Sequence, residues 1–245
     1  MKPLKILIDL DYFLYRAATA SEQEHEYSQD LTVIVGDFSA AKKIVKREIS
    51  QLCERFETRD ILVALTDQTN FRKTIDPTYK GNRRTKRKPA GYLKLKNWAM
   101  ASYPSLMKPG LEADDVCSIV ATNGTLSNFV LVSPDKDMEQ VPCRLYNLKE
   151  EWTQTKEAAY KKLWEQVLSG DSTDGYKGCI SVGPKKALKI LDEVKDENYW
   201  PVVVKTFLDV GQTEEDALRN LRLAKILQAE DWDAKNQKPI LITPK

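Results

Sequence analysis

Acidic residues follow short apolar runs at three points of this chain. Asp9 comes directly after the run LKILI, Asp67 after ILVALT, and Asp135 with Asp137 after NFVLVSP. A short apolar run bounded by polar residues is typical of a buried strand, and the carboxyl ends of parallel strands meet at one edge of a sheet. We therefore expect these carboxylates to lie close together.

Two further acidic clusters belong to other kinds of segment. Glu112, Asp114 and Asp115 occupy the first turn of an expected helix, where the helix dipole favours anions. Asp171 and Asp174 lie in the turn-like sequence GDSTDG. Converging carboxylates repel one another, and hard oxygen ligands in this number suit Mg²⁺ or Mn²⁺. Two such cations can position water and polarise a phosphodiester, so the pattern predicts metal-dependent phosphodiester hydrolysis.

A single acidic pair would carry little weight, because the chain holds 36 acidic residues and exposed loops collect such pairs by chance. The prediction of a metal site rests on the repetition of acidic clusters along the chain. It is supported by charge: the net charge is only +2, but ten basic residues and one acid lie between residues 72 and 96, which gives this basic segment +9 and the rest of the chain −7. A polyanion bound beside an acidic site is one interpretation, and a solvated run of charge is the other.

The sequence GCISVGPKKALKIL also carries a mechanism. A tight turn that leads into a helix start presents backbone N–H groups to phosphate oxygens, and Lys185 and Lys186 would add charge there. An ordinary helix start with surface lysines is the alternative interpretation.

Several classes of protein are disfavoured. The four cysteines are far apart with no Cys-x-x-Cys pair, which argues against zinc and disulfides and fits a reducing cytoplasm. The chain has a single histidine, His25, so mechanisms that need two histidines are excluded. His25 lies in the polar stretch SEQEHEYSQD, which we expect to be an exposed loop. No stretch approaches the roughly 20 apolar residues of a membrane span, and Asp9 interrupts the first apolar run too early for a signal peptide.

Periodicity predicts an α/β fold. Strands are expected at residues 4–9, 60–67, 128–133 and 143–148, and an amphipathic helix at about 37–57. From about residue 156 the chain reads as mostly helical. We expect an α/β core over residues 1–155, with the basic segment as an arch at about 71–97, and a helical half over residues 156–245, together forming one compact unit.

Motifs spread along most of the chain resemble a known superfamily. They are, in order, ILIDLDYFLYRA, LTDQTNFRKTIDPTYKGNR, KRKPAGY, LEADDV, VSPDKDM, SGDSTDGYKGCISVGPKKA and TEEDALRNLRLAKIL. This set resembles the 5′-nuclease (flap endonuclease/5′→3′ exonuclease) superfamily, most closely the 5′→3′ exonucleases of T-odd bacteriophages. The resemblance implies a central, mostly parallel sheet flanked by helices, as in PIN-like nucleases, and a helical C-terminal half with a helix–three-turn–helix element.

The resemblance also implies residue roles. The first metal site would be formed by Asp9, Asp67, Glu112 and Asp114, with Asp115 as a supporting acid. A second, looser site would be formed by Asp135, Asp137, Asp171 and Asp174. Lys80 and Arg72 would engage the scissile phosphate, and Tyr79 would unstack a base beside them. The expected DNA contacts are Tyr79, Arg83, Arg84, Arg87, Lys88, Lys185 and Lys186.

Two positions depart from the superfamily pattern. The superfamily commonly has Asp-Gly after the first strand, whereas here Leu10 follows Asp9, and Asp11, which comes next, is a candidate outer acid. Ser181 replaces a turn glycine, which puts in doubt a monovalent cation, K⁺ in relatives, at that turn.

The resulting functional prediction is a monomeric, cytoplasmic, divalent-metal-dependent 5′→3′ exonuclease and flap endonuclease. Its substrates would be the 5′ ends, flaps or nicks of duplex DNA and RNA–DNA hybrids, as in primer removal during phage-type replication. A PIN-type ribonuclease and a non-catalytic DNA-binding protein with a degraded site remain open alternatives.

Overall fold

The computed structural model describes residues 3–83, 85–194 and 198–244. Its centre is a six-stranded sheet in which four neighbouring pairs are parallel and the last pair is antiparallel. The strand order is β5 (Ser105–Leu106), β4 (Ile61–Ala64), β1 (Lys5–Asp9), β6 (Phe129–Val132), β7 (Arg144–Tyr146) and β8 (Glu151–Thr153). The predicted mostly parallel sheet is confirmed.

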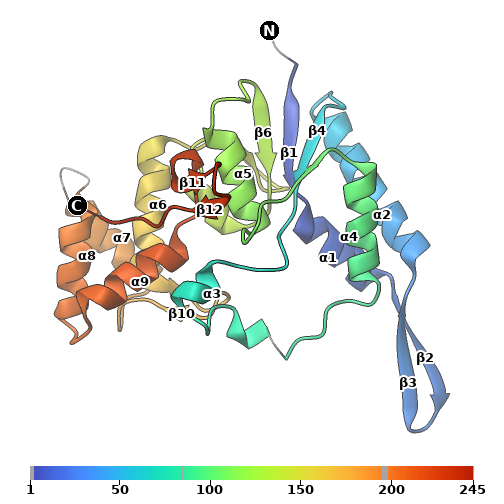
Figure 1. Cartoon of the computed structure of the whole chain (residues 1–245), viewed down its shortest axis with the longest axis horizontal. Coiled ribbons are helices and arrows are strands. Elements are labelled where there is room, and N and C mark those ends of the chain that lie inside the picture. The colour runs from blue at the N-terminus through green and yellow to red at the C-terminus, as the bar shows by residue number, and fades with distance from the viewer. Residues whose placement is uncertain (1–2, 84, 195–197, 245) are drawn as a thin grey trace.

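Helices cover both faces of this sheet (Figure 1). In β1, Ile6 and Ile8 pack on one side and Leu7 on the other, as the two-residue period of a strand requires. The first side is covered by α1 (Leu10–Ala20), α2 (Phe38–Arg55) and α4 (Tyr92–Ser102), and the second by α5 (Ala113–Thr122). The helix expected at about 37–57 is therefore confirmed as α2.

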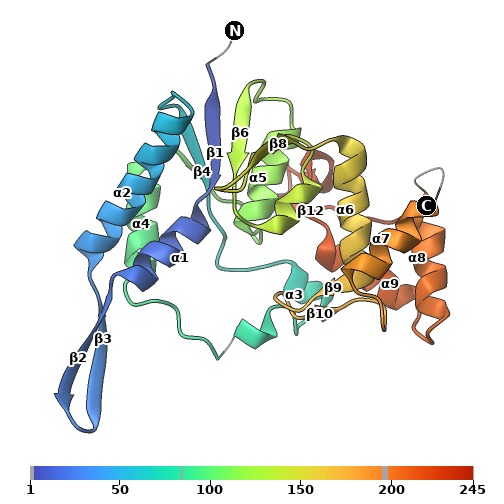
Figure 2. The ribbon, with the colours of Figure 1, turned by 180° about the vertical axis from the view of Figure 1, so that it is seen from behind.

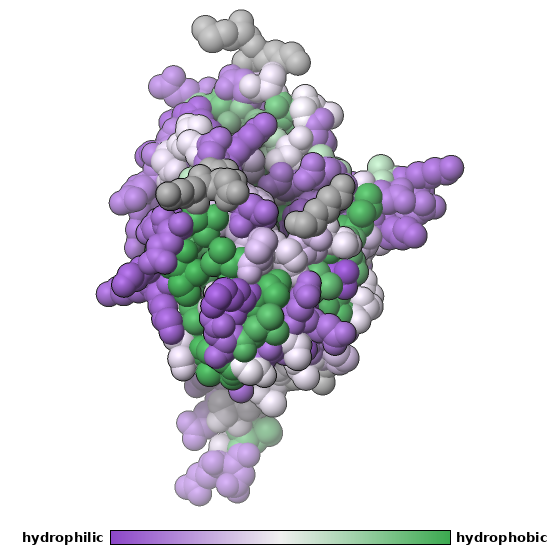
Figure 3. Space-filling model, turned by 90° about the vertical axis from the view of Figure 1, so that its left-hand side faces the viewer, coloured by the Kyte–Doolittle hydropathy of each residue, from purple (hydrophilic) through white to green (hydrophobic). Residues whose placement is uncertain are grey.

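The second half of the chain is helical, as predicted. It contains α6 (Lys156–Ser169), β9 (Gly170–Asp171), β10 (Tyr176–Lys177), α7 (Pro184–Asp192), α8 (Tyr199–Leu208) and α9 (Glu214–Ala224). These helices enclose their own core around Trp164 and Phe207. Figure 3 views this end of the molecule and shows apolar surface lying between hydrophilic side chains.

Short elements complete the fold. They are α3 (Arg72–Ile75), the 3-10 turns η1 (Gly81–Arg83), η2 (Lys136–Gln140) and η3 (Ala229–Asp231), and the pair β11 (Trp232–Asp233) and β12 (Lys238–Pro239). After α9 the chain returns to the sheet half, where Ile226 and Leu227 pack with α5. Within the described ranges, every helix is too short or too polar to cross a membrane.

One expectation was wrong. His25 does not lie in a loop: it belongs to β2 (Glu22–Ser28), which pairs antiparallel with β3 (Leu31–Gly36) in a hairpin that projects from the molecule (Figure 1). The sequence of β2 is polar because almost all of its side chains face solvent, and periodicity detects only strands that bury one face. His25 is exposed, as expected.

Candidate active site

The acids that follow the parallel strands meet at one edge of the sheet, as predicted. Asp9 ends β1, while Asp67 and Asp135 each lie three residues beyond the ends of β4 and β6. A cleft of about 530 Å³ opens at this edge. The acids that line the cleft are Asp9, Asp11, Asp67, Glu112, Asp114 and Asp135.

Hydrogen bonds fix the acids at the start of α5. The carboxylate of Glu112 accepts the N–H of Asp115, and that of Asp115 accepts the N–H of Glu112 at 3.3 Å, which forms a capping box. Asp67 Oδ2 accepts the N–H of Gly110 at 2.8 Å. The Thr69 hydroxyl and this Gly110 N–H lower the pKa of Asp67 to about 2, so the carboxylate is ionised at neutral pH.

Asp9 is buried and only half satisfied. Its Oδ2 accepts the hydroxyl of Ser133 at 2.9 Å, whereas Oδ1 has no hydrogen-bond partner among the described residues. Burial and repulsion from Asp11 raise the pKa of Asp9 to about 7. Asp11 is itself oriented by the N–H of Thr66 at 2.9 Å and by the Tyr92 hydroxyl at 3.2 Å. The sequence analysis missed Ser133 and Tyr92, since neither residue type marks a site by itself.

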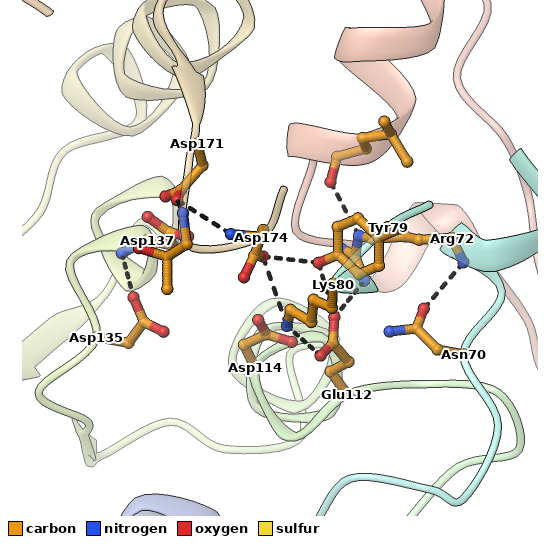
Figure 4. A network of polar contacts seen from close by, with 12 residues as sticks. Asn70, Arg72, Tyr79, Lys80, Glu112, Asp114, Asp135, Asp137, Asp171 and Asp174 are labelled. Atoms are coloured by element: carbon orange, nitrogen blue, oxygen red, sulfur yellow. Dashed lines mark hydrogen bonds and ion pairs between the residues drawn. The ribbon is translucent and has the colours of Figure 1, made fainter. Parts of the chain in front are cut away.

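The other acidic cluster lies beside β9 (Figure 4). Asp135 Oδ1 accepts the N–H of Asp137 at 2.9 Å, and Lys136 Nζ pairs with Asp171 Oδ2 at 3.1 Å. Burial raises the pKa of Asp137 to about 7, and repulsion from Asp135 and Asp171 adds to the rise. Asp137 is therefore close enough to the other three predicted acids of the second site to be repelled by them.

Lys80 links the two clusters (Figure 4). Its ammonium contacts Glu112 Oε1 and lies 3.5 Å from Asp174 Oδ2. Burial opposes the charge on Lys80, but the two acids outweigh it and raise the pKa of Lys80. Although burial also works against ionisation of Glu112, Lys80 and Arg72 hold the pKa of that carboxyl at about 2.

Tyr79 does not offer its ring to a base in this structure. Its side chain is 2% exposed, and its hydroxyl lies 3.0 Å from Glu112 Oε2 and 2.7 Å from Asp174 Oδ2. Burial raises the pKa of Tyr79, so the hydroxyl stays protonated and can donate. The observed role of Tyr79 is to join the two acids, which contradicts the expected stacking position.

Arg72 was also misassigned as a phosphate contact. Its side chain is 2% exposed, and its guanidinium forms a two-pronged ion pair with Asp115, at 2.7 and 2.8 Å. The remaining donors reach the carbonyls of Leu223, at 3.0 Å, and Lys225, at 2.7 Å. Because these acceptors take the N–H donors of Arg72 and its side chain is buried, Arg72 links α9 to α5. Asp115 is correspondingly the buried partner of Arg72, and its role as a supporting acid of a metal site stays a prediction.

Comparisons with known proteins agree with this architecture. The family described as 5′-3′ exonuclease, N-terminal resolvase-like domain, matches residues 5–166. The chain belongs to this 5′–3′ exonuclease family. It is 26% identical to the exodeoxyribonuclease of Enterobacteria phage T3, over 98% of this chain and 93% of that one. It is likewise 26% identical to the exonuclease of Escherichia phage T7, over 93% and 89% of the two chains.

Solved structures show the same fold. The bacteriophage T5 D15 flap endonuclease, in a complex with DNA and metal ions, covers 91% of this chain with a TM-score of 0.67 and 19% identity; 89% of that chain is matched. A T5 5′-exonuclease with bound zinc gives a TM-score of 0.66 at 18% identity, over 90% of this chain and 89% of that one. The resemblance to phage 5′-nucleases is confirmed: this protein is a nuclease of the 5′→3′ exonuclease type, and the non-catalytic alternative is set aside.

The acids of this exonuclease do not form a ready-made metal site. Across residues 3–83, 85–194 and 198–244, no three acidic, histidine or cysteine side chains gather around one point that could hold an ion. The ammonium of Lys80 supplies the positive charge between Glu112 and Asp174 instead. The role of each acid as a metal ligand therefore stays a prediction.

The expected DNA contacts of the exonuclease are mostly exposed. Arg83 pairs with Asp174 at 2.9 Å, and Lys88 stands over the ring of Tyr92. Arg87 pairs with Glu22, an acid that the sequence analysis did not single out. The expected contact Arg84 lies outside the described residues.

The lysines at the start of α7 are exposed as well. Pro184 is the first residue of this helix, as its sequence predicted, and Lys185 and Lys186 follow it. Ser181, just before, has φ +61, the left-handed conformation that favours glycine. Its carbonyl accepts a hydrogen bond from Lys186 Nζ at 3.3 Å. The turn therefore forms without the glycine.

Proposed function

We propose that this exonuclease hydrolyses phosphodiesters near the 5′ ends of duplex DNA, as a 5′→3′ exonuclease and 5′ flap endonuclease that depends on two divalent cations, Mg²⁺ or Mn²⁺. The observation that carries the proposal is the pair of carboxylate clusters, joined by Lys80, at the carboxyl edge of the sheet and beneath exposed basic residues. Carboxylates that are held close together repel one another, which raises their pKa values and costs free energy. A bound cation would offset this cost.

The oxygen donors of the first cluster are of the kind that a divalent cation binds, although they do not surround one point in this structure. Asp9 Oδ1 is a buried oxygen with no hydrogen-bond donor among the described residues, and Glu112 and Asp67 are ionised. These oxygens, together with Asp114, would hold one cation, and Asp135, Asp137, Asp171 and Asp174 the other. Such cations activate water and neutralise charge on a reacting phosphate.

Lys80 is the residue of this chain that we assign to the reacting phosphate. Its side chain is 17% exposed and lines the cleft beside the buried acids. A rotation of its flexible side chain would carry one of its three donors from Glu112 to a phosphate oxygen, where the positive charge stabilises the charge that develops during hydrolysis.

The helical half would hold the duplex. The start of α7 presents its first backbone N–H groups with Lys185 and Lys186 to phosphates of the DNA backbone, which carry no sequence information. We further propose that the protein acts as a monomer on DNA and RNA–DNA hybrids in the cytoplasm of a bacterial host, because its relatives are phage exonucleases. A potassium ion at the Ser181 turn belongs to the same proposal.

A cleavage assay tests the metal dependence. Flapped, nicked and blunt duplexes labelled at the 5′ end should be cut with Mg²⁺ or Mn²⁺ and left intact in excess EDTA, with activity restored when the cation is returned. Asp67→Asn should lower turnover by about a hundredfold or more, since it removes a proposed ligand, while DNA affinity in EDTA stays near the wild-type value. Undiminished cleavage in excess chelator would rule out the metal mechanism.

A further inference from the structure

The hairpin β2–β3 stands out from the rest of the fold. It projects away from the sheet half in both views (Figures 1 and 2), and most of its side chains are exposed. An isolated two-stranded hairpin is at best marginally stable in water. The base of the hairpin, however, contacts the basic segment.

Glu22 forms the first part of the connection. Its Oε1 accepts the N–H of Ala90 at 2.6 Å, and its Oε2 accepts from Arg87 Nη2 at 3.0 Å. These donors, with Arg87 first, lower the pKa of Glu22 to about 2. The carboxylate is therefore ionised at neutral pH.

Gly36, at the other end of the hairpin, forms the second part. It pairs with Glu22 across the two strands. A Cβ atom at Gly36 would lie 2.2 Å from the carbonyl oxygen of Ala90, so the backbones approach too closely for any side chain. Ala90, in the basic segment, thus contacts both strands of the hairpin, at Glu22 and at Gly36.

This connection is the main anchor of residues 86–90. Within the described residues, the hydrogen bonds that residues 86–90 donate to a side chain of another element all go to Glu22. Other contacts are local: Lys86 N–H donates to the Arg83 carbonyl, and Lys88 stands over the Tyr92 ring. If Glu22 is removed, the stretch loses these side-chain hydrogen bonds to the hairpin and keeps the backbone contact of Ala90 with Gly36.

The anchored stretch borders the way into the acidic cleft. A hollow of about 460 Å³ is lined by Tyr15, Arg83, Lys86, Arg87, Lys88, Tyr92 and Thr173. The hollow and the acidic cleft share Tyr15, Arg83, Lys88 and Tyr92. Any displacement of residues 86–90 therefore changes the opening between the basic segment, α1, α4 and the turn that contains Thr173.

We propose that Glu22 is a positioning residue: through Arg87 and Ala90 it holds the basic segment at the distance from α1 and α4 at which a single-stranded 5′ end reaches the acidic cleft. The inference rests on the proposed function for its substrate. It also reassigns Arg87, which was predicted to contact phosphate, to the anchoring of its own segment.

The anchor itself can be tested without DNA. Hydrogen exchange of the Ala90 amide should be at least about tenfold faster in Glu22→Ala than in the wild type, because its acceptor is gone. Glu22→Gln, which keeps an acceptor oxygen, should fall between the two. Glu26→Ala is the matched control, since Glu26 is an exposed acid on the same face of the same strand. Equal exchange in Glu22→Ala and Glu26→Ala would overturn the inference.

The functional arm compares two labelled DNA duplexes in the presence of Mg²⁺, one with a single-stranded 5′ flap and one with a blunt end. Glu22→Ala should raise KM for the flapped duplex by about tenfold, the effect of one charge-assisted contact, with kcat within about twofold. KM for the blunt duplex should change less. Gly36→Ala, which displaces Ala90 by contact, should act in the same direction, whereas Glu26→Ala should match the wild type.

Arg87 gives the sharpest outcome. If it anchors the segment, Arg87→Ala should raise KM for the flap as Glu22→Ala does, and the double variant should be no worse than either single variant. If Arg87 instead contacts phosphate, loss of Glu22 would free it, so affinity for the flap would increase in Glu22→Ala and decrease in Arg87→Ala. Opposite signs would overturn the inference. A wild-type protein that cuts neither duplex would refute the proposed function, while the Ala90 exchange would still decide the anchor.

Discussion

The two ends of the basic segment are alike in charge and different in environment. At the inner end, Arg72 is 2% exposed and Lys80 touches Glu112 and Asp174. At the outer end, Lys86 and Lys88 are exposed and the side chain of Arg83 is 47% exposed. The inner cations therefore balance buried acids, and the outer ones face solvent, where a polyanion can reach them.

The difference shows that a run of basic residues can perform two tasks. Position along the chain decides between them: α3 contacts α9 and Tyr79 packs into the core of the helical half, whereas Asn82, Arg83 and residues 85–88 are exposed. We expect inner substitutions to damage stability or turnover, and outer substitutions to weaken DNA binding. The predictions below test this division.

The largest effect should come from Arg72. Arg72→Ala leaves Asp115 charged and buried without its partner, which typically costs about 3–5 kcal/mol. Thermal unfolding should shift down by roughly 10 °C for a chain of this size. Arg83→Ala is the matched change at the outer end and should leave Tm within about 2 °C of the wild type, because its ion pair is half exposed. Equal Tm values for the two variants would remove the distinction.

Lys80 should affect turnover rather than affinity. Lys80→Ala should lower kcat on a 5′-flapped duplex by about ten- to a hundredfold, with little change in KM, since the proposed contact forms with the reacting phosphate. Lys73→Ala, an exposed lysine on α3, serves as the control and should be active. A rise in KM with kcat unchanged would show that Lys80 contributes to DNA binding, as we expect of the outer end, rather than to turnover.

A smaller effect is expected from pH in the metal-free protein. The pKa values of Asp9 and Asp137 are raised to about 7 from the ordinary value of 3.8, so between these pH values the folded state binds more protons than the unfolded state. Stability in EDTA should therefore fall as pH rises from about 5 to 7 and then level off. Glu112 and Asp67, whose pKa values in the folded state are about 2, act in the opposite direction below about pH 5, where the unfolded chain still binds their protons, so the comparison is made from pH 5 upward. Tm measured in EDTA at pH 5 and pH 8 checks the sign, and a higher Tm at pH 8 would contradict it.

The sequence predicted those features that local patterns encode. The buried run before Asp9 and the helical period of α2 gave correct elements. Long-range partners could not be predicted. Arg72 and Asp115 are 43 residues apart and Glu22 and Arg87 are 65 apart, so no local rule joins them. The hairpin β2–β3 was missed because its faces are solvated and its residues show no buried period.

The salt dependence of DNA binding tests the division most directly. Affinity for a 5′-flapped duplex, measured in EDTA over a range of salt concentrations, should be compared for the wild type, Lys80→Ala, and a combined Arg83→Ala, Lys86→Ala and Lys88→Ala variant. The account predicts that the slope of log affinity against log salt is unchanged in Lys80→Ala and falls by up to about 0.9 per lost phosphate contact in the combined variant. A combined variant with the wild-type slope, or a Lys80→Ala slope that falls instead, would contradict the account.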